Sequence, residues 1–174
     1  MARVSEVFGD LDGYNDRPKG EFELMPHGTY VLAKITEVKG KQGACMVKSE
    51  TQTIQAGLDG NYGHPHFWDH VNFITPAPVD PELDEEAQKK GRQKIGMWAR
   101  RITTLGLDPK QVDTEWTADE YADFFQPTVG ATVIIKTRLE AARGEYKARN
   151  TANDYVPDTP ANRKKYGLDA EVEL

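Results

Sequence analysis

The sequence predicts a mainly β protein with an α-helical component. β-Branched and aromatic residues gather in five short segments that are bounded by turn residues, which is typical of strands. Between the third and fourth segments, apolar residues recur at spacings of three and four, which is typical of one face of a helix. We expect strands at 29–38, 44–53, 66–74, 131–139 and 145–151, and a helix at 81–105.

Composition limits the classes of function. The 174 residues suit one domain that is long enough to bury a core. A single cysteine, Cys45, excludes an intramolecular disulfide and a cysteine-rich zinc site. Because Cys45 lies in an apolar strand, we expect a small buried hydrophobe rather than a reactive thiolate. The sequence shows neither a signal peptide nor a membrane span, so we expect a cytoplasmic protein.

The third strand, 66–74, separates two kinds of side chain. On alternation, Phe67, Val71 and Phe73 share a core face, whereas Trp68 lies among polar groups on the other face. The helix that follows is expected to have Asp80 as its N-cap and Pro81 as its first residue. Residues 107–128 then form an acidic insertion, in which Thr117 and Glu120 predict the capping box of a short helix.

The two ends of the chain are expected to lack much regular structure. Residues 1–28 are rich in glycine, proline and charge, and predict an N-terminal arm tied down by Val7, Phe8 and Phe22. Residues 29–157 form the expected domain. Residues 158–174 predict a mobile tail with a short acidic end, which suits contacts with other proteins.

The segment 129–150 predicts a basic β-hairpin. It has five basic residues against two acidic ones, in a chain whose net charge is −6. With Arg143 and Gly144 as the central turn residues, Glu140 faces Lys147 and Arg138 faces Arg149. Lys136, Arg138, Lys147 and Arg149 then share one face of the hairpin. A local basic face on an acidic protein suggests a polyanionic partner, although a merely solvated face remains the alternative.

Basic residues and aromatic residues occur together on the predicted strands, as binding of single-stranded nucleic acid requires. Cations follow the phosphates, and flat rings stack on the bases whatever the sequence. For Tyr146, alternation also allows a place in the core. The candidate cations are Lys34, Lys48, Lys136, Arg138, Arg143, Lys147 and Arg149, and the candidate rings are Tyr62, Trp68, Tyr146 and Tyr155.

The order of these elements resembles that of phage-encoded single-stranded DNA-binding proteins. The similar features are a GTY sequence that opens the first strand, an NF pair that follows an aromatic strand, and a basic hairpin that ends in Asn150, Asn153, Tyr155 and Pro157. The resemblance covers about residues 25–157. It implies an OB-fold, a five-stranded Greek-key barrel with a helix between strands 3 and 4.

The resemblance also implies a function. Such a protein coats and protects single-stranded intermediates of phage replication or recombination in the host cytoplasm, without strong sequence preference. It works without catalysis, cofactor or metal. Several copies can assemble on the DNA, and an acidic C-terminal tail can contact replication or recombination proteins.

Two alternatives come from other features of the sequence. His64, His66, Asp69 and His70 resemble the metal-binding HxHxDH run of metallo-β-lactamase-like hydrolases, with one extra residue before the aspartate. This would make the chain a metal-dependent hydrolase or nuclease. In the other alternative, the acidic segment binds a protein partner and the basic hairpin is only solvated.

Overall fold

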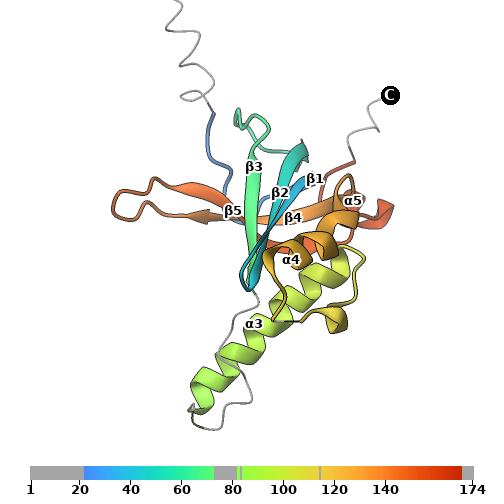
Figure 1. The fold of residues 1–174 in the computed structure, drawn as a ribbon. Coiled ribbons are helices and arrows are strands. Elements are labelled where there is room, and N and C mark those ends of the chain that lie inside the picture. Colours follow the sequence, from blue (N-terminus) through green and yellow to red (C-terminus); the bar gives the residue numbers. More distant parts are fainter. Residues whose placement is uncertain (1–21, 73–81, 83, 114, 170–174) are drawn as a thin grey trace, which may run out of the picture.

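The computed structural model describes residues 22–72, 82, 84–113 and 115–169. These form a mixed α/β structure with a five-stranded antiparallel sheet in the order β3-β2-β1-β4-β5 (Figure 1). The strands are β1 (Tyr30–Lys41), β2 (Ala44–Ile54), β3 (His66–Asn72), β4 (Thr132–Glu140) and β5 (Arg149–Val156). The helices are α3 (Glu85–Thr104), η1 (Pro109–Gln111), α4 (Ala118–Phe125), η2 (Gln126–Thr128) and α5 (Pro160–Lys165). The prediction of five strands with a helix between the third and fourth is confirmed, although the fifth strand lies later in the chain than predicted.

The sheet curls around β1 but does not close into a barrel by hydrogen bonds. β1 pairs with β2 on one side and β4 on the other, and its pairing with β2 is interrupted by two register shifts. Such bulges bend a strand and increase its twist. β3 and β5 are therefore the edge strands. Some of their Cα atoms lie within 8 Å of each other, although the two strands are not hydrogen-bonded neighbours.

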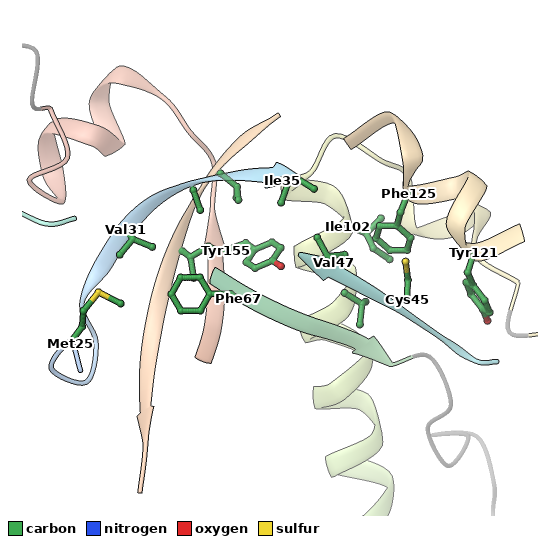
Figure 2. Close-up of a cluster of buried hydrophobic side chains, with 14 residues drawn as sticks. Met25, Val31, Ile35, Cys45, Val47, Phe67, Ile102, Tyr121, Phe125 and Tyr155 are labelled. Atoms are coloured by element: carbon green, nitrogen blue, oxygen red, sulfur yellow. The ribbon is translucent and has the colours of Figure 1, made fainter. Parts of the chain in front are cut away.

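The concave face of the curled sheet holds the main core (Figure 2). Val31 and Ile35 of β1 point into it, together with Val47 of β2, Phe67 of β3 and Tyr155 of β5. Helices α3 and α4 close one end of this core with three buried side chains, Ile102, Tyr121 and Phe125. Cys45 is buried there too, so its predicted role as a small hydrophobe is confirmed.

The helices begin where their caps place them. α4 has the predicted capping box, in which Thr117 and Glu120 bond each other's backbone N–H groups. It packs closely on β1, because a Cβ on Gly40 would lie 1.7 Å from the carbonyl oxygen of Ala118. α3 begins at Glu85 with Asp84 as its N-cap, later than predicted. Asp80 and Pro81 lie outside the described residues.

A buried ionic cluster joins the two edge strands. The guanidinium of Arg101, on α3, lies 3.4 Å from the carboxylate of Asp69 on β3 and donates a 3.1 Å hydrogen bond to the Asn153 carbonyl on β5. It also lies over the Tyr155 ring, 5.5 Å from its centroid. Burial raises the pKa of Asp69, and the charge of Arg101 opposes that rise. Burial, reinforced by the Asp69 carboxylate, raises the pKa of Tyr155 well above its usual value.

The C-terminal segment is docked rather than mobile as far as residue 169. The Tyr166 ring stacks on Tyr30, with centroids 3.9 Å apart, and Leu168 is buried against Leu32 and Ile134. Leu32 and Ile134 face the convex side of the sheet and would otherwise be exposed to water. Within the tail predicted at 158–174, residues 158–169 thus include a helix and a buried contact with the sheet, and residues 170–174 lie outside the described structure.

The last residues of the predicted N-terminal arm are also held in place. Met25 is fully buried, and its backbone N–H and carbonyl both bond the side-chain amide of Asn150 at 2.9 Å. Glu23 donates its backbone N–H to the Asn61 carbonyl. Residues 22–28 therefore line the sheet between β5 and the β2–β3 loop. Val7 and Phe8 lie outside the described residues.

Replacing Arg101 should loosen the contact between the edge strands. The side chains of Arg101 and Asp69 are only 11% and 10% exposed. Removing one partner of a buried pair leaves the other charge unpaired, so Arg101→Met should lower the free energy of unfolding by about 3 kcal/mol. The neighbouring exposed Arg100 supplies the control, since Arg100→Met should change it by less than about 0.5 kcal/mol. Urea unfolding monitored by circular dichroism measures both.

A double variant separates lost charge pairing from lost packing. Asp69→Leu combined with Arg101→Met removes both charges, so it should be more stable than Arg101→Met alone. Equal losses for Arg101→Met and Arg100→Met would show that the cluster does not stabilise the fold.

Cys45 should be protected from thiol reagents in the folded protein. Burial raises the pKa of its thiol to about 11, so at pH 8 only about one thiol in a thousand is ionised. Reaction with Ellman's reagent should be at least about 100-fold slower in buffer than in 8 M urea. Rapid reaction of the folded protein would mean that the end of the core beside α4 opens readily.

Candidate nucleic-acid interface

The basic hairpin forms, but its turn lies one residue later than predicted. Arg143 and Tyr146 exchange two backbone hydrogen bonds of 2.9 Å, so Gly144 and Glu145 are the central turn residues. Gly144 has φ +57°, the left-handed conformation that favours glycine at this position. The predicted pairing of Glu140 with Lys147 is therefore wrong, and Glu140 faces Arg149 instead.

The corrected register changes the charge pattern of the hairpin. Arg149 forms an exposed ion pair of 3.2 Å with Glu140, while Arg138 faces Thr151. β5 accordingly runs from Arg149 to Val156 rather than over 145–151. Lys136 lies farther from the turn, half-buried opposite Asp154. Arg138 therefore has no acidic residue directly across the ladder, whereas Lys136 and Arg149 do.

The hairpin tip forms an open pocket of about 540 Å³, which we call the hairpin pocket. It brings together four of the predicted cations and one predicted ring. The ring, Tyr146, is 75% exposed, so the alternative that placed it in the core is wrong. The side chains that line the pocket include Arg138, Leu139, Glu140, Arg143, Tyr146, Lys147 and Arg149.

A second candidate surface lies on the convex face of β2 and β3. Trp68 is 43% exposed, and the Nζ of Lys48 lies 5.2 Å from the centroid of its ring. The two residues are direct partners across the ladder. The exposed indole thus lies next to a cation. A nucleobase could stack on the indole while its phosphate lies near the ammonium of Lys48.

Three predicted contact residues are placed differently. Tyr155 is buried among Phe67 and Val47 in the core, so its ring is not exposed for stacking and that prediction is wrong (Figure 2). Lys34 is exposed but lies between Glu50 and Thr132, at the end of β4 away from the hairpin. Tyr62 is half-buried and packs against the core.

A smaller pocket of about 260 Å³ lies between the N-terminal segment and the β2–β3 loop, and we call it the Phe22 pocket. Sequence reasoning assigned Tyr62 to the interface but missed its partners. Phe22 and Leu24 lie in a segment with no strand or helix pattern. The sequence therefore contains no sign that these two side chains are exposed beside Tyr62. The pocket is lined by Phe22, Glu23, Leu24, Tyr62, His64, Pro65 and Asn150.

Large exposed hydrophobic side chains concentrate on these three surfaces. Of the six in the described part of the chain, only Met97 of α3 lies elsewhere. The other five are Phe22 and Leu24 in the Phe22 pocket, Leu139 and Tyr146 in the hairpin pocket, and Trp68 on β3. Scattered exposed hydrophobic residues need no explanation, but exposed hydrophobic residues that lie together, such as Leu139 and Tyr146, indicate a candidate interaction surface.

The acidic insertion lies away from the hairpin. α4, within 107–128, packs on the end of β1 at Gly40, and the β4–β5 hairpin projects on the other side of the sheet (Figure 1). This separation lets a chain of net charge −6 present a basic surface at one end.

The histidine run does not form a metal site. His66 and His70 are exposed on the convex face beside Trp68, whereas Asp69 points the other way, to Arg101. The Nδ1 of His64 lies 3.2 Å from the Thr51 carbonyl. No group of three or more histidine, cysteine, aspartate or glutamate side chains in the described ranges is arranged to hold a metal. The hydrolase alternative therefore loses the cluster on which it depended.

Within the described residues, no helix has the length and apolar character needed to cross a membrane. Comparison with models of known protein families gives no match, and comparison with curated proteins gives none either. The arrangement of rings and cations on this surface is therefore the basis for assigning a function.

Proposed function

We propose that this chain binds single-stranded DNA without strong sequence preference, as a phage protein in the host cytoplasm that coats and protects replication or recombination intermediates. The observation that carries the proposal is the exposed Tyr146 ring among the four cations of the hairpin pocket, in a protein whose net charge is −6. Within this proposal the fold is an OB-fold. The strand order β3-β2-β1-β4-β5, with β3 and β5 approaching each other, supports it.

The phosphates are bound by the cations at the tip of the hairpin. Arg138, Arg143 and Lys147 are exposed there, and a strand that neutralises their charge releases counterions from its phosphates. Arg149 contributes less, because Glu140 already neutralises it. Binding of this kind weakens steeply as salt concentration rises.

The bases stack on the exposed rings. Tyr146 in the hairpin pocket and Trp68 on β3 each offer an aromatic face, and stacking contributes roughly 1–3 kcal/mol per base. Every base has such a face, so stacking tolerates any sequence. In a duplex the bases already stack on one another, so these rings select single strands.

The interaction-module alternative makes the opposite claim about the hairpin, since it treats the basic residues as solvation only. The two functions can be distinguished by experiment, because the interaction module requires a protein partner and has no affinity for DNA. Assembly of several copies on the DNA, and contacts between the acidic C-terminus and replication or recombination proteins, belong to the proposal as well.

A fluorescence titration with an oligo-dT of about 30 nucleotides tests the proposal. Stacking on Trp68 should quench the protein's tryptophan fluorescence at sub-micromolar concentration, and a duplex of equal length should do so far less. Arg138→Ala and Lys147→Ala should each weaken binding and lower the slope of log K against log salt by about 0.7.

Lys110→Ala is the matched control, since it removes an exposed cation from the acidic insertion. It should leave both affinity and slope unchanged. No binding by either fluorescence or gel shift would overturn the proposal and favour the interaction module. Equal effects of Lys110→Ala and Lys147→Ala would mean that general charge, and not the hairpin, attracts the DNA.

A further inference from the structure

We infer that the Phe22 pocket is a binding site for one nucleobase of the bound strand, separate from the ring surfaces of Tyr146 and Trp68. The inference rests on the proposed function, because it assigns a subsite on the same DNA path. The pocket's volume of about 260 Å³ is below the roughly 300–1,000 Å³ of sites for drug-sized ligands, so it suits a single planar ring system.

The walls of the pocket are preformed. Gly63 has φ +66°, and a Cβ there would lie 3.0 Å from the Phe22 ring, so this ring rests directly on the glycine backbone. Asn150 fixes the N-terminal segment through its two hydrogen bonds to Met25. The half-buried Tyr62, which packs against the core, supplies a second aromatic ring. Such preorganisation lowers the entropic cost of binding.

The charge of the pocket favours a base over a phosphate. Among the described residues no lysine or arginine lines it, and Glu23 places a carboxylate in its wall. His64 supplies a polar group for the edge of a base. In the neutral imidazole, the 3.2 Å contact with the Thr51 carbonyl places the proton on Nδ1 and leaves Nε2 as an acceptor, for example for the N3–H of thymine.

The position of the pocket links the two parts of the proposed DNA surface. On one side, Asn150 is the chain neighbour of Arg149, which lines the hairpin pocket. On the other side, His64 and Pro65 lead directly into β3, where Trp68 follows four residues after His64. The elements that line the pocket are thus continuous in the chain with the hairpin on one side and with β3 on the other.

The first test compares DNA with and without bases. Phe22→Ala should weaken binding of oligo-dT by at least about five-fold, because one stacked base is lost. It should leave binding of an abasic oligonucleotide of equal length unchanged, since the phosphate contacts remain. Met97→Ala is the matched control: Met97 and Phe22 are 40% and 49% exposed, and Met97 lies outside the proposed path.

The second test uses the unaltered protein. An oligo-dT with 5-iododeoxyuridine at successive positions is irradiated, and the cross-linked peptides are identified by mass spectrometry. A cross-link to Phe22 or Tyr62 is expected. Cross-links confined to Trp68 and the hairpin, with dT binding unaffected by Phe22→Ala, would overturn the base pocket and leave the proposed function intact. Absence of oligo-dT binding by the unaltered protein would overturn both.

Discussion

The contact of Arg101 with both edge strands is the constraint on which the shape of the sheet depends. β3 and β5 approach each other without backbone hydrogen bonds, so side chains have to hold that boundary. Arg101 does so from α3, because its guanidinium contacts Asp69 on β3 and the Asn153 carbonyl on β5. The guanidinium presents five donors in a fixed planar fork, so it can reach acceptors on two strands and lie over the Tyr155 ring at once. Together with the bulges of β1 and the burial of Ile102, Arg101 therefore links the curled sheet to α3.

This curl gives the sheet a convex face, of which one region is covered by the chain and another is exposed. Around Leu32 and Ile134, the docked C-terminal segment covers the sheet with Tyr166 and Leu168. Around β3 and the hairpin, Trp68, Tyr146 and other apolar side chains stay exposed beside cations. The same chain thus buries apolar surface in one region and leaves it open in another. That contrast supports a ligand for the open region better than the exposure of any single ring does.

The sequence predicted the presence of helices and strands better than their ends. It also predicted the exposure of the basic side chains better than that of the aromatic rings. Alternation and helical spacing are local signals, so five strands and the α3 helix could be found from them. The hairpin register depended on the position of the turn, and a shift of one residue changed the partner of Glu140 from Lys147 to Arg149. Tyr155 was misassigned because it is buried by core side chains that are distant in sequence, such as Val47 and Phe67. The docked tail and the Phe22 pocket were missed for the same reason, since tertiary contacts alone create them.

In the proposed function, the three ring surfaces would recognise a single strand through different forces. Cations at the hairpin tip attract phosphates over the Debye length of about 8 Å at physiological salt. Trp68 and Tyr146 act only at contact, through stacking. The described lining of the Phe22 pocket has no lysine or arginine and contains Glu23, which favours the proposed base over a phosphate. Under the proposed function, a strand attracted to the hairpin would also be oriented, with its bases turned toward the exposed rings. Charge alone would bind any polyanion, whereas the proposed stacking requires unstacked bases.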